Sequence, residues 1–191
     1  MKKIEMVYRE ILRSAMEKRK GQLTQSELAK SLGISLSTVN HALKPLRKMG
    51  AIRVKPRGLE VVSAKKTLFY WASIRNLESD IIYRTRASRP VIDIEKGMPG
   101  DIVFGGYSAY KFMFKSVPAD YSEVYVYADS PEEIKKRFPE SKNPPNIFVL
   151  KREFDSMTVA HLFVDLWNMK EWYAREFVME LEGRLEKMGL G

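Results

Sequence analysis

The stretch from Thr24 to Gly50, TQSELAKSLGISLSTVNHALKPLRKMG, constrains the fold of this chain more than any other. Thr24 and Glu27 form a T-x-x-E capping box, which predicts that a helix begins just after Thr24. Gly33 predicts the end of that helix, because glycine adopts the positive φ of a tight corner at the lowest cost. Ser35 then stands where it can cap a second helix. Two helices around a sharp corner are the pattern of a helix-turn-helix.

The second helix is predicted to have two faces of different character. Its apolar residues recur at helical spacing and are expected on the buried side: Leu36, Val39, Leu43 and Leu46. The opposite side carries hydrogen-bonding and cationic groups suited to a DNA groove. The residues predicted to contact DNA here are Ser35, Ser37, Thr38, Asn40, His41, Lys44, Arg47 and Lys48. An ordinary helical hairpin within a core is the alternative interpretation.

After Gly50 the apolar pattern changes to a period of two. Residues 51–55 alternate, residues 56–58 form a turn, and residues 59–62 alternate again, which predicts a β-hairpin. A hairpin directly after a recognition helix is the wing of a winged helix. Lys55 and Arg57 at its tip are predicted to contact the minor groove or phosphates, a solvated turn being the alternative.

Charge is divided unevenly along the chain. Up to Lys66 there are 16 Lys and Arg against 5 Asp and Glu, whereas the remainder has 17 against 19. This division predicts a basic part that meets a polyanion, joined to a part with another role. With no cysteine and only His41 and His161, neither disulfides nor zinc are expected, and we predict no metal and no cofactor.

Hydropathy and composition bear on where the protein works. No apolar run reaches membrane-spanning length, and the first 20 residues are amphipathic and contain three glutamates, so a signal peptide is not expected. We therefore predict a soluble cytoplasmic protein without membrane contact. Frequent Lys, Arg and Glu together with absent Cys fit a thermophile.

The predicted fold class is α+β. We expect a winged-helix DNA-binding domain over residues 1–66, a connecting helix over 67–79, and a small α/β domain over 80–191. In the last of these, extended segments are predicted over 81–84, 91–94, 101–104, 123–127 and 147–150. They are expected to alternate with helices over 107–114, 131–138, 159–169 and 170–188.

The turn at Gly105-Gly106, with Ser108 opening a helix, resembles the phosphate-cradling turn of nucleotidyltransferases. That chemistry also needs paired acids on the following strand to hold Mg²⁺. The strand EVYVYAD offers only Glu123 and Asp129, one at each end. We therefore predict a degenerate nucleotidyltransferase-like fold without catalysis, so that the protein is not an enzyme.

Two further stretches carry a resemblance to a known family. DIVFGGYSAYKFMF, residues 101–114, and TVAHLFVDLWNMKEWYAREFVMELEGRL, residues 158–185, resemble the second domain of AbiEi-like antitoxins. Those are winged-helix transcriptional regulators of type IV, abortive-infection toxin–antitoxin pairs. The resemblance implies an antitoxin that represses its own operon, with a separate nucleotidyltransferase toxin as its functional partner.

The leading functional prediction is a sequence-specific regulator that binds double-stranded DNA. We expect the polar residues of the second helix to read bases, the cations to neutralise phosphates, and a homodimer to bind a palindromic site. Two alternatives stay open. One is a nucleotidyltransferase enzyme with a nucleic-acid-binding head, and the other is a repressor whose second domain senses a small ligand.

Overall fold

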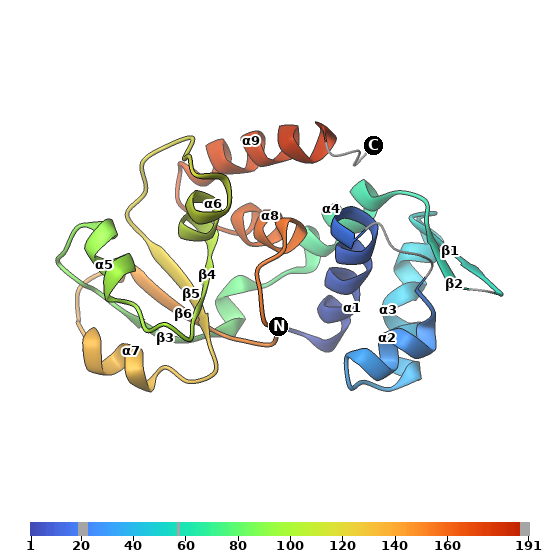
Figure 1. Ribbon diagram of the computed structural model, residues 1–191, viewed down its shortest axis with the longest axis horizontal. Helices are drawn as coiled ribbons and strands as arrows, with labels where there is room; N and C mark the ends of the chain where they lie inside the picture. The colour runs from blue at the N-terminus through green and yellow to red at the C-terminus, as the bar shows by residue number, and fades with distance from the viewer. Residues whose placement is uncertain (19–22, 57, 188–191) are drawn as a thin grey trace. The chain divides into compact units, whose positions relative to one another are not determined.

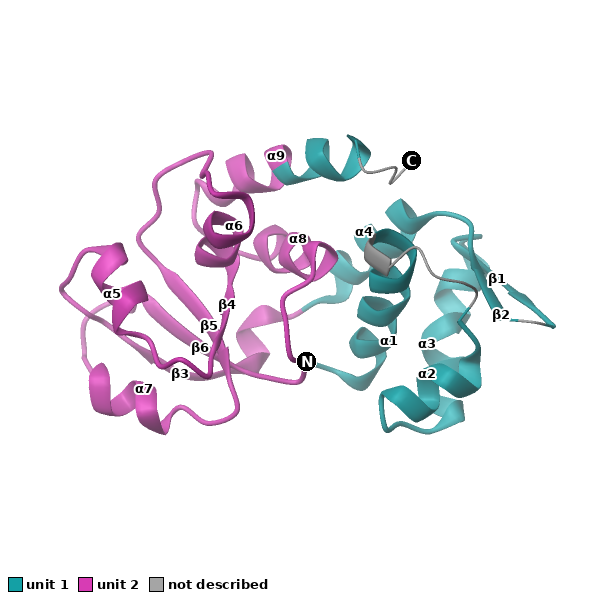
Figure 2. Cartoon of the chain, viewed as in Figure 1, with its two compact units in different colours: residues 1–75, 181–191 teal, residues 76–180 magenta. Residues whose placement is uncertain are grey.

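The computed structural model describes residues 1–18, 23–56 and 58–187 and mixes helices with two β-sheets (Figure 1). The chain divides into two compact units (Figure 2). Unit 1 comprises Met1–Arg75 together with Leu181–Gly191, and unit 2 comprises Asn76–Glu180. The last helix, α9 (Ala174–Lys187), contributes its first half to unit 2 and its second half to unit 1.

Unit 1 contains a helical core followed by a β-hairpin. Its elements are α1 (Lys3–Leu12), a π-helical turn (Arg13–Lys18), α2 (Gln25–Ser31), α3 (Leu36–Lys48), β1 (Ile52–Lys55), β2 (Gly58–Val61) and α4 (Ala64–Ile74). The strands β1 and β2 pair antiparallel. The backbone N–H of Leu59 also donates to the carbonyl of Leu23, 2.6 Å away, so the segment before α2 adds a bridge to the hairpin.

Local sequence signals set the ends of α2 and α3. The Thr24 hydroxyl accepts from the N–H of Glu27 at 3.1 Å, and the N–H of Thr24 donates to the Glu27 carboxylate at 2.8 Å. These two bonds confirm the predicted capping box. The Ser35 hydroxyl caps α3 in the same way, and Gly33 makes the corner with a φ of +61°.

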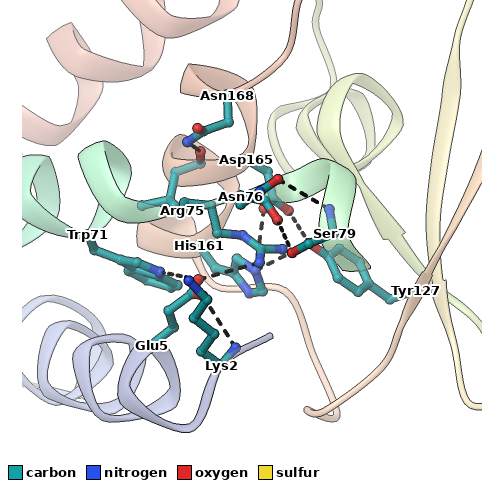
Figure 3. A network of polar contacts seen from close by, with 11 residues as sticks. Lys2, Glu5, Trp71, Arg75, Asn76, Ser79, Tyr127, His161, Asp165 and Asn168 are labelled. Carbon is teal, nitrogen blue, oxygen red and sulfur yellow. Dashed lines mark hydrogen bonds and ion pairs between the residues drawn. The ribbon is translucent and has the colours of Figure 1, made fainter. Parts of the chain in front are cut away.

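The core of unit 1 fixes α3 against α1 and α4. The side chains of Val39, Leu43 and Leu46 are buried, and the Tyr8 hydroxyl of α1 donates to the Ala42 carbonyl of α3 at 3.0 Å. Behind them lies a buried carboxylate, Glu5, which accepts from the Trp71 indole N–H at 3.1 Å (Figure 3). The same carboxylate oxygen lies 3.4 Å from the Arg75 guanidinium. Because buried charges are costly unless paired, this contact favours a defined packing of α4 on α1.

Unit 2 is built on a mixed four-stranded sheet of order β3-β6-β5-β4. The strands are β3 (Ile81–Thr85), β4 (Val103–Gly105), β5 (Val124–Ala128) and β6 (Ile147–Lys151). The central pair β5–β6 is parallel, and both outer pairs are antiparallel. The other elements are a 3₁₀ turn (Leu77–Asp80), α5 (Val91–Gly97), α6 (Gly106–Phe114), α7 (Glu132–Arg137) and α8 (Val159–Trp167).

Helices cover both faces of this sheet, which makes three layers (Figure 1). On one face, Val124, Val126 and Val149 pack with Ile94 of α5 and Ile134 of α7. On the other face, Tyr125 meets the Tyr107 ring of α6, and the Tyr127 hydroxyl donates to Asp165 of α8 at 2.6 Å (Figure 3). All five residues of β5 are therefore buried, as expected for a central strand.

Two of the predictions from sequence are wrong at the level of local structure. Residues 91–94 form the start of α5 instead of an extended segment. Pro90 is the N-cap residue of this helix, and the helical turn places the Ile94 side chain in the core. Leu36 is 48% exposed although periodicity placed it on the buried side. It is the first residue of α3 and lies ahead of the turn that packs on the core.

The division into units also differs from the predicted boundaries. The helix expected to connect the domains over residues 67–79 is α4, which ends at Ile74 and lies within unit 1. Residues 181–191, predicted to belong to the second domain, are grouped with unit 1. Lys65 of α4 contributes to that grouping through ion pairs with Glu186 at 2.9 Å and Glu182 at 3.5 Å.

Candidate nucleic-acid interface

The exposed side of α3 carries an ordered row of polar groups. Ser37, His41, Lys44 and Lys48 are all exposed. Their spacing of four, three and four residues places them on one helical face. The buried side of the same helix holds it to the core, so the polar row faces solvent on a rigid element. Asn40 lies at the edge of this row and is half-buried.

Two of the predicted contact residues have a structural task at the start of α3. The Ser35 hydroxyl accepts from the N–H of Thr38 at 3.1 Å and lies 2.8 Å from the Thr38 hydroxyl. Ser35 is exposed and Thr38 is half-buried. Their mutual hydrogen bonds stabilise the first turn and so position Ser37.

Three cations lie in the second half of α3, and two of them, Lys44 and Lys48, belong to the row. Lys44, Arg47 and Lys48 are exposed, and no acidic partner for them is found among the described residues. At the C-terminal end of α3, the carbonyl of Met49 accepts a hydrogen bond from the Lys66 ammonium at 3.1 Å. The three side chains are therefore open to an external anion.

The wing formed by β1 and β2 has a different charge arrangement. The Lys55 ammonium lies 2.9 Å from the Glu60 carboxylate, and the Arg53 guanidinium lies 3.9 Å from it. The nearby Lys55 ammonium lowers the pKa of Glu60 below its ordinary value of 4.5, so Glu60 is charged at neutral pH. Lys55 is thus already paired. Arg57, predicted at the tip, lies outside the described residues.

A family model for winged helix-turn-helix DNA-binding domains matches residues 9–53. The chain contains a winged helix-turn-helix DNA-binding domain. Comparison with curated proteins and with solved structures gave no match. Within the part of the chain that the structure describes, no helix is long and apolar enough to cross a membrane.

Sequence reasoning missed one residue of the winged helix surface, Leu36. This exposed apolar side chain lies between Ser35 and Ser37 at the start of α3. The apolar period from Leu36 to Val39 suggested burial. Its exposure could have been predicted from its place at the first helical position, directly after a capping serine. An exposed leucine there offers an apolar contact within an otherwise polar surface.

The acids of unit 2 that could have formed a metal site are far apart. Glu123 and Asp129 flank β5, six residues apart, which corresponds to about 20 Å along an extended strand. Asp129 is instead bound by the Arg152 guanidinium, whose Nε lies 3.0 Å from it. Among the described residues, no group of three His, Cys, Asp or Glu is arranged to hold a metal ion.

The side chain of Met169 packs against the Gly105-Gly106 turn. Gly106 begins α6 with a φ of +49°, and a Cβ at this position would lie 2.2 Å from the Met169 methyl group. The positive φ therefore favours glycine at this position, and a Cβ would also displace the end of the Met169 side chain. The backbone conformation and the packing of this turn account for Gly106 without a bound phosphate.

Proposed function

We propose that this protein is a sequence-specific DNA-binding transcriptional regulator that inserts α3 into the major groove. The observation that carries the proposal is the row of exposed Ser37, His41, Lys44 and Lys48 on a helix whose other face is buried. An α-helix fits the width of the B-DNA major groove, and recognition helices contact bases mainly through their first residues. The polar row supplies groups for that contact.

Base recognition is assigned to the first half of α3. Ser37, Asn40 and His41 provide hydrogen-bond donors and acceptors, and an asparagine amide can bind adenine through two bonds. Leu36 provides an apolar contact of the kind that recognises the methyl group of thymine. These residues would carry the sequence preference.

Phosphate contact is assigned to the cations that follow. Lys44, Arg47 and Lys48 have no acidic partner among the described residues, so binding a phosphate breaks no ion pair. Each phosphate neutralised makes the slope of log affinity against log salt more negative by about 0.9. These contacts add affinity for any duplex.

The test begins by selecting duplexes from a random pool with the full chain. We expect Asn40→Ala to narrow the difference in affinity between the selected and a random duplex by about 5- to 150-fold, as one base contact of about 1–3 kcal/mol predicts. Lys48→Ala should weaken both duplexes alike and make the salt slope shallower by about one unit. The control is Lys96→Ala, at an exposed lysine of α5 in unit 2. Failure of the full chain to bind any duplex would contradict the proposal.

The proposed contact between Leu36 and a thymine methyl group can be tested by removing that methyl group from the DNA. Replacing thymine by deoxyuridine removes only the methyl group from the base. We expect this replacement at one position of the selected site to weaken binding of the unchanged protein and to have no effect on Leu36→Ala. Equal losses in both proteins would contradict the assignment of Leu36 to the methyl group.

We further propose that the protein acts as an antitoxin without enzymatic activity of its own. The resemblance of residues 101–114 and 158–185 to AbiEi-like antitoxins supports this role, as does the separation of Glu123 from Asp129. The antitoxin role predicts a footprint on the protein's own promoter and relief of toxicity when a neighbouring nucleotidyltransferase is co-expressed. Transfer of label from nucleoside triphosphates to RNA in the presence of Mg²⁺ would contradict the non-enzymatic role.

A further inference from the structure

We propose that a surface of unit 2 joins two copies of this chain. This Trp172 surface is formed by the end of α8, the turn after it and the start of α9. Its members are Trp167, Met169, Glu171, Trp172, Arg175 and Val178. The inference goes beyond DNA binding, because it concerns residues that unit 1 does not contain.

Exposure of large aromatic side chains is the first observation. Trp172 is 83% exposed and Trp167 is 46% exposed. Burying such a side chain removes about 150–250 Å² from water, so leaving two of them exposed in one place is unfavourable. Contiguous apolar patches rimmed by polar groups mark interaction sites.

The exposure is fixed by the anchoring of α9. The adjacent residue Tyr173 is buried, and its ring centre lies 5.1 Å from that of Tyr107. One turn further on, Phe177 is fully buried, with its ring centre 4.8 Å from Tyr107 and 5.2 Å from Tyr110. Because these rings hold one side of the segment against α6, Trp172 is held on the outer side.

A hollow and an exposed side chain lie next to each other on this surface. Trp167 and Trp172 border a hollow of about 310 Å³, which is large enough to accept an indole side chain. The surface therefore carries both an exposed indole and a recess with room for one. In a pair related by a two-fold axis, Trp172 of each copy enters the hollow of the other.

Charge selects a second copy as the occupant. Glu171 and Arg175 both line the hollow. The Glu171 carboxylate is held by the Tyr107 and Tyr125 hydroxyls, which donate to it at 2.9 Å and 2.8 Å. No acidic partner of Arg175 is found within the described residues. In the two-fold pair, Arg175 of one copy meets Glu171 of the other, and this happens twice.

Net charge does not oppose this choice. The excess of positive charge lies in residues 1–66, whereas the remainder of the chain carries 17 Lys and Arg against 19 Asp and Glu. The hollow of the Trp172 surface is lined by one cation, Arg175, and one anion, Glu171. Two copies can therefore meet there without repulsion between like charges. Such a pair supplies two winged helices to one DNA, which matches recognition of two half-sites.

The test is the mass of the full chain in solution by sedimentation equilibrium. The unchanged protein is expected to give twice its chain mass of 22.1 kDa at micromolar concentration. Trp172→Ala should raise the dissociation constant at least tenfold, and Arg175→Glu should do the same, because it places a second carboxylate against Glu171. The matched control is Ile92→Ala, which removes another exposed apolar side chain, 51% exposed, from α5. It should leave the dimer unchanged.

Several outcomes would overturn the proposal. They are a monomeric unchanged protein at about 100 µM, a dimer that survives both substitutions, and a mass that increases without limit because the contact is head-to-tail. Circular dichroism of each variant shows whether loss of the dimer comes from loss of the fold. If Trp172→Ala does not fold, the Arg175→Glu result decides. A blue shift of tryptophan fluorescence on raising the concentration, absent in Trp172→Ala, provides an independent expected result.

Discussion

Glu60 is predicted to restrain the DNA affinity of the wing. It lies directly opposite Arg53 in the β1–β2 pairing, and its carboxylate lies 2.9 Å from the Lys55 ammonium. The pKa of Glu60 is lowered by this ion pair, so the carboxylate stays charged throughout the neutral range. Glu60→Gln keeps the size of the side chain but removes its charge, which releases Lys55 to bind phosphate.

The expected magnitude follows from counterion release. One added phosphate contact makes the slope of log affinity against log salt steeper by about 0.9. Between about 50 mM and 200 mM salt, affinity for Glu60→Gln should therefore fall about 3.5-fold more than affinity for the unchanged protein. At low salt the variant should bind any duplex more tightly. Sequence preference should not change, because phosphate contacts do not identify bases.

The assay is fluorescence anisotropy of a labelled duplex titrated at four salt concentrations. Lys55→Ala alone should change the slope little, since Lys55 is paired with Glu60 in the unchanged protein. The double variant should also return to the original slope, because the released cation is missing. A Glu60→Gln slope equal to the original would refute the reasoning. Equal steepening in the Lys55→Ala background would refute the assignment to Lys55 and point to Arg53, 3.9 Å from Glu60.

Three further predictions concern stability. Gly106→Ala should lower the free energy of unfolding by about 1–3 kcal/mol because of its positive φ and the nearby Met169 methyl group. Gly183→Ala in α9, where a Cβ meets nothing within 4 Å, should raise it by about 0.5–1 kcal/mol, and thermal unfolding compares the two. Hydrogen bonds from Thr24 lower the pKa of Glu27 from 4.5, so its stabilisation is complete above that pH and is lost as the pH falls through the lowered pKa. Glu27→Gln should therefore lower the unfolding temperature at pH 7, and its difference from the unchanged protein should vanish in acid. A difference independent of pH would contradict this account.

Features set by neighbouring residues were predictable from the sequence. The bonds between Thr24 and Glu27, the cap at Ser35 and the corner at Gly33 each depend on residues within one turn. The strand at β5 was also predictable, because a buried central strand is apolar almost throughout. The prediction of an extended segment over residues 91–94 was wrong because Val and Ile occur both in strands and on buried helix faces. The packing of Ile94 into the core favours the helix.

Features set by tertiary contacts were not predictable. The pairing of Lys55 with Glu60 depends on the register of two strands, which the sequence of the turn does not determine alone. The exposure of Trp172 depends on which side of α9 meets α6, and a tryptophan is more often buried than exposed. Burial of Leu36 was predicted from the apolar period of its helix, but Leu36 is exposed. The period does not indicate at which residue the helix begins to pack on the core.

The most direct test of DNA recognition by α3 compares two proteins in one selection experiment. The full chain and a variant with Leu36, Ser37, Asn40 and His41 all replaced by alanine are each used to select duplexes from a random pool. Because the four side chains lie outside the buried core, the variant should keep its fold by circular dichroism. We predict that the unchanged protein enriches one defined site, whereas the variant binds duplex DNA without enriching any. Enrichment of the same site by both proteins, or of none by the unchanged protein, would contradict the account.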